Sequence, residues 1–344
     1  MSTTSTIQTL ETSDVQDKIL RFRKVQEGIV NQIHNVIVGQ HEIIEQVLIG
    51  LFVGGHCLIT GLPGTAKTLL VRTIGQILGL EFKRIQFTPD LMPSDITGTD
   101  IIEEDPTSGR RTWTFVPGPI FANILLADEI NRTPPKTQSA LLEAMQEQSV
   151  TVGGKMHRLE NPFMVLATQN PIEMEGTYPL PEAQVDRFFF KLLLEFPSRA
   201  DLARIPDLTT AAPASGPREV LDAAGILQMR QWVREVPLAE VVKDYAVRLV
   251  MSTHPQQRQG NGSGGLAQRF VLYGSSPRGL QSVILAAKAR ALLAGRANVS
   301  FDDIRTQLLP SLRHRLILNL EADAEGVTAE KILTEVAAQV PEVE

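Results

Sequence analysis

The sequence predicts an α/β domain built on a parallel five-stranded sheet, followed by a smaller all-α domain. Five apolar runs lack the alternation of half-buried strands, and helical or loop segments separate them; they occupy residues 57–60, 82–87, 124–127, 163–168 and 188–196. Such runs are typical of parallel strands that helices cover on both faces. Beyond residue 217 the apolar residues recur at helical spacing. The length of 344 residues also fits two domains.

Composition excludes several classes of protein. Hydrophobic residues make up 43% of the chain, and the net charge of −6 provides no general positive field for nucleic acid or anionic membranes. The single cysteine, Cys57, excludes an intrachain disulfide and suits a reducing compartment. The first residues lack the basic and apolar regions of a signal peptide, and no unbroken run of about 20 apolar residues occurs. We therefore expect a cytoplasmic protein without a membrane span.

The order of elements divides the chain into four parts. The Ser/Thr-rich residues 1–15 are expected to form a disordered tail, and an α/β core follows over residues 16–197, with a first amphipathic helix from Asp17 to His34. Residues 198–217 form the linker region, whose composition predicts a short helix followed by the linker itself, and a helical lid spans residues 218–340. The lid helices are predicted near residues 222–234, 238–253, 277–294, 300–318 and 328–339, with a glycine-rich surface loop at 256–266.

A glycine-rich turn joins the first predicted strand to a helix. Its sequence, Gly61-Leu-Pro-Gly-Thr-Ala-Lys-Thr68, has the strand–turn–helix context of a P-loop. In a P-loop, backbone N–H groups bind phosphate oxygens, the lysine, here Lys67, reaches the β- and γ-phosphates, and the hydroxyl of Thr68 can bind Mg²⁺. Ala66 replaces the last glycine of the usual pattern. A plain strand-to-helix turn therefore remains the alternative for this motif taken alone.

Polar residues follow two later strands. Asp128 and Glu129 end the apolar strand 124–127, and carboxylates there are costly unless they have partners. Beside a P-loop, Asp128 would hold Mg²⁺ and Glu129 would polarise the attacking water. Asn170 follows the run 163–168 and could bond to the γ-phosphate or to that water, although an Asn before a Pro is often only a turn residue.

These motifs together resemble the AAA+ ATPases, and among them the MoxR family. The resemblance rests on the P-loop, on Asp186-Arg-Phe188 and Ser276-Pro-Arg278, and on three longer segments, 84–98, 128–138 and 178–188. It covers most of the chain. The P-loop of that family carries alanine before the lysine, so Ala66 no longer argues against a nucleotide site.

The resemblance implies ATP and Mg²⁺ as ligands and assigns a role to each matching residue. Glu129, Lys67 and Asn170 (sensor 1) would act in catalysis, Arg278 (sensor 2) would reach the nucleotide in the cleft from the lid, and Arg187 would be the arginine finger for the neighbouring subunit of a homo-hexameric ring. Arg132 is a second candidate for such a contact in trans. The residues expected to bind ATP are Val38, Gly39, Gln40, Gly61, Pro63, Gly64, Thr65, Ala66, Lys67, Thr68, Leu69, Asp128 and Arg278, and those expected to bind the metal are Thr68 and Asp128.

Two insertions are expected in this branch of the AAA+ proteins. Residues 91–119 match a helix-2 insert of loop-like composition, and residues 148–160 predict a hairpin that turns at Gly153-Gly154, before sensor 1. Both are expected to face the ring pore or a client, and ordinary surface loops are the alternative.

The leading hypothesis is an ATP-hydrolysing ring that remodels or matures a partner protein, with metal or cofactor insertion as one form of this. By resemblance the partner contains a von Willebrand factor A domain. A nucleic-acid motor is one alternative, although the net charge of −6 argues against it. The other is a nucleotide-gated binding module without turnover, which the presence of Glu129 and Arg187 disfavours.

Overall fold

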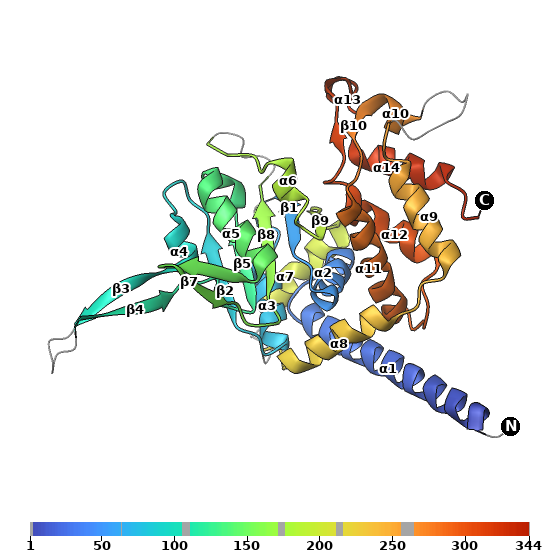
Figure 1. Cartoon of the computed structure of the whole chain (residues 1–344), viewed down its shortest axis with the longest axis horizontal. Coiled ribbons are helices and arrows are strands. Elements are labelled where there is room, and N and C mark those ends of the chain that lie inside the picture. The colour runs from blue at the N-terminus through green and yellow to red at the C-terminus, as the bar shows by residue number, and fades with distance from the viewer. Residues whose placement is uncertain are drawn as a thin grey trace.

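The computed structural model describes residues 3–62, 64–104, 111–170, 176–210, 216–255 and 265–343. Its centre is a five-stranded sheet in the order β2-β5-β8-β1-β9 in which every pair of neighbours is parallel (Figure 1). The predicted fold class is thereby confirmed. The strands are β1 (Cys57–Gly61), β2 (Phe82–Gln86), β5 (Ile124–Asp128), β8 (Met164–Gln169) and β9 (Phe190–Leu194).

Helices cover both faces of this sheet, which explains its apolar strands. Along β5, Ile124 and Leu126 belong to one hydrophobic core and Leu125 and Ala127 to another, as the alternation of side chains in a strand requires. The first core includes residues of α1 (Thr3–His34), α2 (His41–Val53), α3 (Lys67–Ile77) and the lid. The second includes residues of α5 (Pro135–Glu147).

The first helix starts earlier than the sequence pattern suggests. We expected a disordered tail over residues 1–15, but α1 is helical from Thr3. The segment before Gly28 holds no proline or glycine to interrupt a helix. The helix therefore continues beyond its anchored half, where Phe22, Ile29 and Ile33 are fully buried. No helix in the described ranges is long and apolar enough to cross a membrane.

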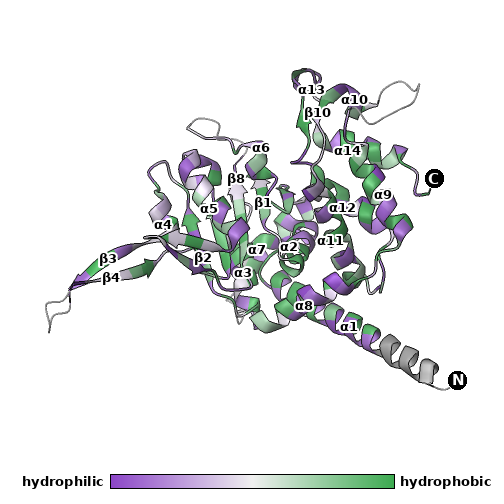
Figure 2. Cartoon of the chain, viewed as in Figure 1, coloured by the Kyte–Doolittle hydropathy of each residue, from purple (hydrophilic) through white to green (hydrophobic). Residues whose placement is uncertain are grey.

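The segment predicted to be a loop-like insert is mainly a β-hairpin. After α4 (Pro93–Thr97), β3 (Gly98–Glu104) pairs with β4 (Arg111–Pro117), and the ribbon projects from the body of the molecule (Figure 1). Both hydrophobic and hydrophilic residues line it (Figure 2). The turn between the strands, residues 105–110, lies outside the described residues. Strands β3 and β4 mix polar and apolar residues, so neither forms an apolar run that would predict a strand.

A second hairpin supports the first. β6 (Ser149–Val152) and β7 (Lys155–Arg158) are joined by Gly153 and Gly154, both at positive φ. The ring of His157 stacks on Phe115 of β4 with centroids 3.9 Å apart. A Cβ on Gly153 would lie 2.0 Å from Asp100 of β3. The two hairpins therefore pack side by side.

The C-terminal part is a helical lid with one small sheet. After α7 (Arg199–Thr210), its main helices are α8 (Ala223–Glu235), α9 (Glu240–Met251), α11 (Pro277–Leu293), α12 (Phe301–Leu312) and α14 (Ala329–Gln339). The short α10 (Leu266–Phe270) and α13 (Leu320–Glu325) complete it.

The lid differs from the prediction at the end of α12 (Phe301–Leu312). The helix predicted over residues 300–318 ends at Leu312, and Ile317–Leu318 form β11, which pairs with β10 (Val271–Tyr273). The apolar residues of β11 continue the helical spacing, so the sequence pattern could not show this break. Most of the predicted glycine-rich loop, residues 256–264, lies outside the described residues.

Candidate nucleotide-binding site

The P-loop runs from the end of β1 to the start of α3. A Cβ on Gly61 would lie 2.7 Å from the Cβ of Leu194 on the neighbouring strand, so only glycine fits there. Gly64 has φ +79° and Ala66 φ +63°, and the left-handed region costs a residue with a side chain about 1–2 kcal/mol. Ala66 therefore occupies a position where the glycine of the usual pattern would be less strained. Pro63, a predicted ATP-binding residue, lies outside the described residues.

The lysine of the P-loop is folded back onto the loop. Lys67 Nζ donates to the carbonyl oxygens of Gly61 (2.7 Å) and Leu62 (3.3 Å). Burial lowers the pKa of Lys67, and the charges of Asp128 and Glu129 oppose that shift. Since these carboxylates influence Lys67, the two predicted motifs belong to one site.

Asp128, at the end of β5, is almost fully buried and has partners at both carboxylate oxygens. Thr168 donates from its hydroxyl to Oδ1 (2.5 Å). Arg84, on β2, donates to Oδ2 from Nη2 (2.7 Å) and Nε (3.1 Å). These bonds therefore hold the carboxylate in a fixed orientation at the carboxyl end of β5.

Glu129 lies one residue beyond the strand, at φ +57°. Its Oε2 accepts hydrogen bonds from Gln86 Nε2 (2.7 Å) and Arg132 Nη1 (3.2 Å), and its N–H donates to the hydroxyl of Thr168 (2.9 Å). Arg132, predicted as a contact in trans, thus pairs within its own chain. Asn170, only 7% exposed, follows β8 at the same edge. The structure therefore gathers Lys67, Asp128, Glu129 and Asn170 at the carboxyl ends of adjacent strands.

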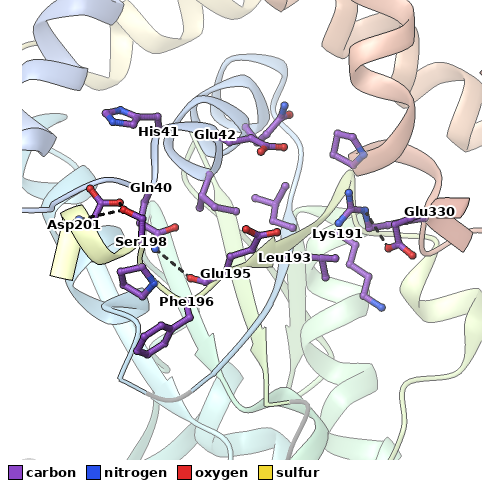
Figure 3. Close-up of a pocket in the computed structure, with 16 residues that line it drawn as sticks. Gln40, His41, Glu42, Lys191, Leu193, Glu195, Phe196, Ser198, Asp201 and Glu330 are labelled. Atoms are coloured by element: carbon purple, nitrogen blue, oxygen red, sulfur yellow. Dashed lines mark hydrogen bonds and ion pairs between the residues drawn. The ribbon is translucent and has the colours of Figure 1, made fainter. Parts of the chain in front are cut away.

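A pocket of about 590 Å³ lies at this edge between core and lid (Figure 3). Gln40, at φ +57°, lines it and donates from Nε2 to the carbonyl oxygen of Glu195 (3.4 Å). Lys191 and Glu330 lie on the opposite side (Figure 3). Gln40, the last residue of the segment Val38 to Gln40 that is expected to bind ATP, thus lines a pocket beside β9, the neighbour of the strand that precedes the P-loop.

Arg187 lies at the opposite end of the strands, where β1 and β9 begin. It immediately precedes Phe188 and Phe189, and Phe189 N–H donates to the carbonyl oxygen of His56, the residue before β1 (2.7 Å). Five residues of β1 separate that point from the P-loop, about 16 Å at strand rise. Arg187 Nη1 donates to the carbonyl oxygen of Leu142 (2.9 Å). Arg187 is therefore far from the P-loop of its own chain.

Arg278 is also away from that P-loop, which corrects our expectation. Its Nη1 lies 3.5 Å from Asp186 Oδ2, and it lines a pocket of about 280 Å³ together with Arg187 and Gly54. The cause is local: Ser276, before the first turn of α11, donates its hydroxyl to Asp186 Oδ1 (2.9 Å). This bond fixes the start of α11 beside Arg187 rather than over the cleft of the same chain.

Comparison with known proteins decides the family. The model of the ATPase family associated with various cellular activities (AAA) matches residues 56–190, and the AAA lid domain matches residues 265–336. The chain is 40% identical to Chaperone MoxR1 of Mycobacterium tuberculosis over 91% of its length and 81% of the relative. The chain belongs to the MoxR family of AAA+ ATPases.

Other relatives agree with this membership. Protein MoxR of Paracoccus denitrificans is 31% identical to this MoxR-family chain, over 89% of the chain and 91% of the relative. A crystal structure from Cytophaga hutchinsonii has a TM-score of 0.87 and 38% identity, and the match covers 96% of this chain and 99% of that one.

In this MoxR-family ATPase, sequence reasoning missed the residues that hold the two carboxylates. Arg84 and Gln86 lie two apart on β2, so their side chains share one face, and they contact Asp128 and Glu129 respectively. Thr168 bridges β8 to both residues. The available signal for the first pair was the spacing of Arg84 and Gln86, two positions apart on either side of the buried Ile85.

Proposed function

We propose that the chain hydrolyses ATP with Mg²⁺ in a homo-hexameric ring and uses the cycle to remodel or mature a partner protein. The observation that carries the proposal is the separation of the site into two halves. The carboxyl ends of the strands carry Lys67, Glu129 and Asn170. The amino ends carry Arg187, with Arg278 beside it. One chain cannot bring these halves together around one nucleotide, whereas two adjacent chains can.

The residues at the P-loop edge suit the proposed ligands. Backbone N–H groups at the start of α3 and the ammonium of Lys67 are suited to phosphate oxygens. The Thr68 hydroxyl and the Asp128 carboxylate are the oxygen donors that Mg²⁺ prefers, and they would hold it. When bound, Mg²⁺ neutralises negative charge on the β- and γ-phosphates. The Val38–Gln40 segment and its pocket would take the adenine.

Glu129 is the proposed general base. A carboxylate beside a water molecule can accept its proton as the water attacks the γ-phosphorus. In the structure Gln86 and Arg132 both donate to Oε2 of Glu129. These bonds fix the position of the carboxylate. Asn170 would orient the same water or the γ-phosphate.

Arg187 and Arg278 would serve the nucleotide of the adjacent subunit. A guanidinium that neutralises charge on the transferred phosphoryl group contributes about 10³–10⁵ in rate. Turnover should therefore depend on assembly. The pairing of Arg278 with Asp186, next to Arg187, supports a shared role for the two arginines.

The partner is proposed from the family alone. MoxR1 is named a chaperone, so we propose chaperone-like action, with metal or cofactor insertion as one possible outcome for the client. The family resemblance suggests a partner with a von Willebrand factor A domain and a cytoplasmic location, and nucleic acid is not expected as a ligand.

ATP hydrolysis should be measured against protein concentration, with molecular mass recorded at each point. We expect specific activity to rise with assembly, to vanish in Glu129→Gln and to fall steeply in Arg187→Ala while ATP binding persists. Arg204→Ala, at an exposed arginine on α7, is the matched control. Turnover that is independent of concentration and of Arg187 would favour the nucleotide-gated module, and stimulation by DNA with a steep salt dependence would favour the nucleic-acid motor.

A further inference from the structure

One buried arginine of the lid binds the segment that carries Arg187. Arg315 is 7% exposed. Its Nε donates to Asp186 Oδ1 (2.8 Å), and its Nη2 donates to the carbonyl oxygens of Asp186 (3.1 Å) and Phe188 (2.8 Å). Its Nη1 donates to the carbonyl oxygens of Phe189 (3.2 Å) and Ser311. These bonds use all five N–H groups of the guanidinium.

The preceding residue makes a parallel contact. His314 is half-buried, and its Nε2 lies 3.0 Å from the carbonyl oxygen of Phe188. Burial and then the charge of Arg315 lower the pKa of His314 well below its ordinary value. The ring is therefore neutral and donates through Nε2. Two consecutive lid residues thus hold the backbone on both sides of Arg187.

The same stretch of the lid also borders the pocket that Gln40 lines, where the adenine is proposed to lie. Pro310 and Arg313 line that pocket, together with Glu330 of α14. Arg315 follows only two residues after Arg313. This short stretch therefore connects the lining of the pocket to Asp186 and Phe188, the residues on either side of Arg187.

We propose that Arg315 is a positioning residue that locks the Asp186–Phe189 segment to the lid and so sets where Arg187 and Arg278 are presented to the adjacent subunit. Nucleotide binding in one subunit would then adjust the arginines offered to the next active site. The inference rests on the proposed ring with Arg187 acting in trans. Arg315 itself touches no nucleotide.

The proposal predicts a separation of kinetic constants. Arg315→Met leaves the P-loop intact but removes the Arg315 hydrogen bonds to four backbone carbonyls, those of Asp186, Phe188, Phe189 and Ser311. A displacement of catalytic groups by about 1 Å can cost about 10² in rate, so we expect kcat to fall about 10²-fold with the KM for ATP within about twofold of wild type. Arg305→Met, at a partly exposed arginine on α12, should change neither constant.

Mixed rings separate positioning from a general loss of structure. Glu129→Gln subunits cannot hydrolyse ATP but keep Arg187 and Arg315, whereas Arg315→Met subunits keep Glu129. Mixing the two should raise the activity per Arg315→Met subunit more than about tenfold over Arg315→Met alone, because neighbours then supply well-placed arginines. Should Arg315→Met fail to fold by circular dichroism, Arg315→Lys, which keeps the charge but not the fork of donors, takes its place.

Arg187→Ala mixed with Glu129→Gln is the reference. If this reference pair complements and the Arg315 variant does not, Arg315 acts within its own subunit and the inference is overturned. If neither pair complements although mass measurements show mixed rings, the assignment of Arg187 in trans is itself wrong. The proposal is supported if both pairs complement and if mixing Arg305→Met with Glu129→Gln does not raise the activity per Arg305→Met subunit.

Discussion

The lid contains a fully buried carboxylate whose loss should be costly. Asp303 has 0% exposure. It accepts hydrogen bonds from Arg296 Nη1 (2.7 Å) and Nη2 (2.5 Å) and from Arg290 Nη1 (3.1 Å). It also accepts from the N–H and hydroxyl of Ser300 (both 2.9 Å), which forms a capping box at the start of α12.

Asp303→Ala removes the shared partner of two arginines and half of the capping box. Breaking a buried ion pair from one side costs about 3–5 kcal/mol, and losing a cap costs about 1 kcal/mol. The side chains of Arg290 and Arg296 are 25% and 36% exposed, so both regain some water. We therefore expect the lid to lose about 3 kcal/mol of unfolding free energy.

Urea unfolding tests this value. The chain has two tryptophans, and in a Trp113→Phe background the fluorescence reports only Trp232, which packs in the core shared with the lid. Asp302→Ala is the matched control, because the side chain of Asp302 is 67% exposed although it also pairs with Arg290; it should cost below about 1 kcal/mol. Equal losses in the two variants would refute the reasoning from burial.

The same carboxylate gives a pH dependence of defined sign. Burial would raise the pKa of Asp303, but the hydrogen bonds from Arg296 and Ser300 outweigh it and hold the pKa below its ordinary value. Its contribution is therefore fully present above the unfolded pKa of about 3.9 and is lost as the pH falls through the lower folded value. Asp303→Asn should flatten the decline of lid stability below about pH 4.

Three further predictions concern the core. Glu129→Gln should keep ATP affinity within about twofold in equilibrium binding and lower turnover by at least about 10²; rapid turnover would exclude Glu129 as the base. Burial lowers the pKa of His56 to about 4, so its contribution to stability is complete above the unfolded pKa of about 6.5 and declines as the pH falls toward 4. In His56→Gln the melting temperature should therefore fall less steeply with decreasing pH over this range. An unchanged pH dependence of the melting temperature would assign that dependence to other groups. Gly61→Ala places a Cβ 2.7 Å from Leu194, so it should lower the free energy of unfolding by about 1–3 kcal/mol and weaken ATP binding. If the variant keeps the melting temperature and ATP affinity of the wild type, the loop relaxes around the added methyl group.

The sequence was most informative where one local segment determines the outcome. The P-loop is one continuous turn, and the five strands are continuous apolar runs, so both were predictable. Arg84 and Thr168 were not, because each contacts Asp128 across 40 or more positions of sequence. Arg315 contacts Asp186 across 129 positions. No local pattern encodes such pairings.

The placement of Arg278 failed for a related reason. The Ser276-Pro277 signal correctly predicted where α11 begins, but a helix start does not specify which edge of the core it faces. That choice depends on Asp186, which binds Ser276 and Arg315 from the lid. The start of α11 could be predicted from its own sequence, whereas the side of the core that it faces could not.

The contact between the two hairpins has a mechanical consequence. An isolated two-stranded ribbon has little stiffness of its own. The stack of Phe115 on His157 and the close approach of Asp100 to Gly153 brace β3–β4 near its base, whereas Glu104 and Arg111, near the tip, are solvent-exposed. The ribbon should therefore flex beyond the brace and stay rigid below it. The braced part of β3–β4 would therefore move together with the β6–β7 hairpin, because Phe115 and Asp100 tie it to His157 and Gly153.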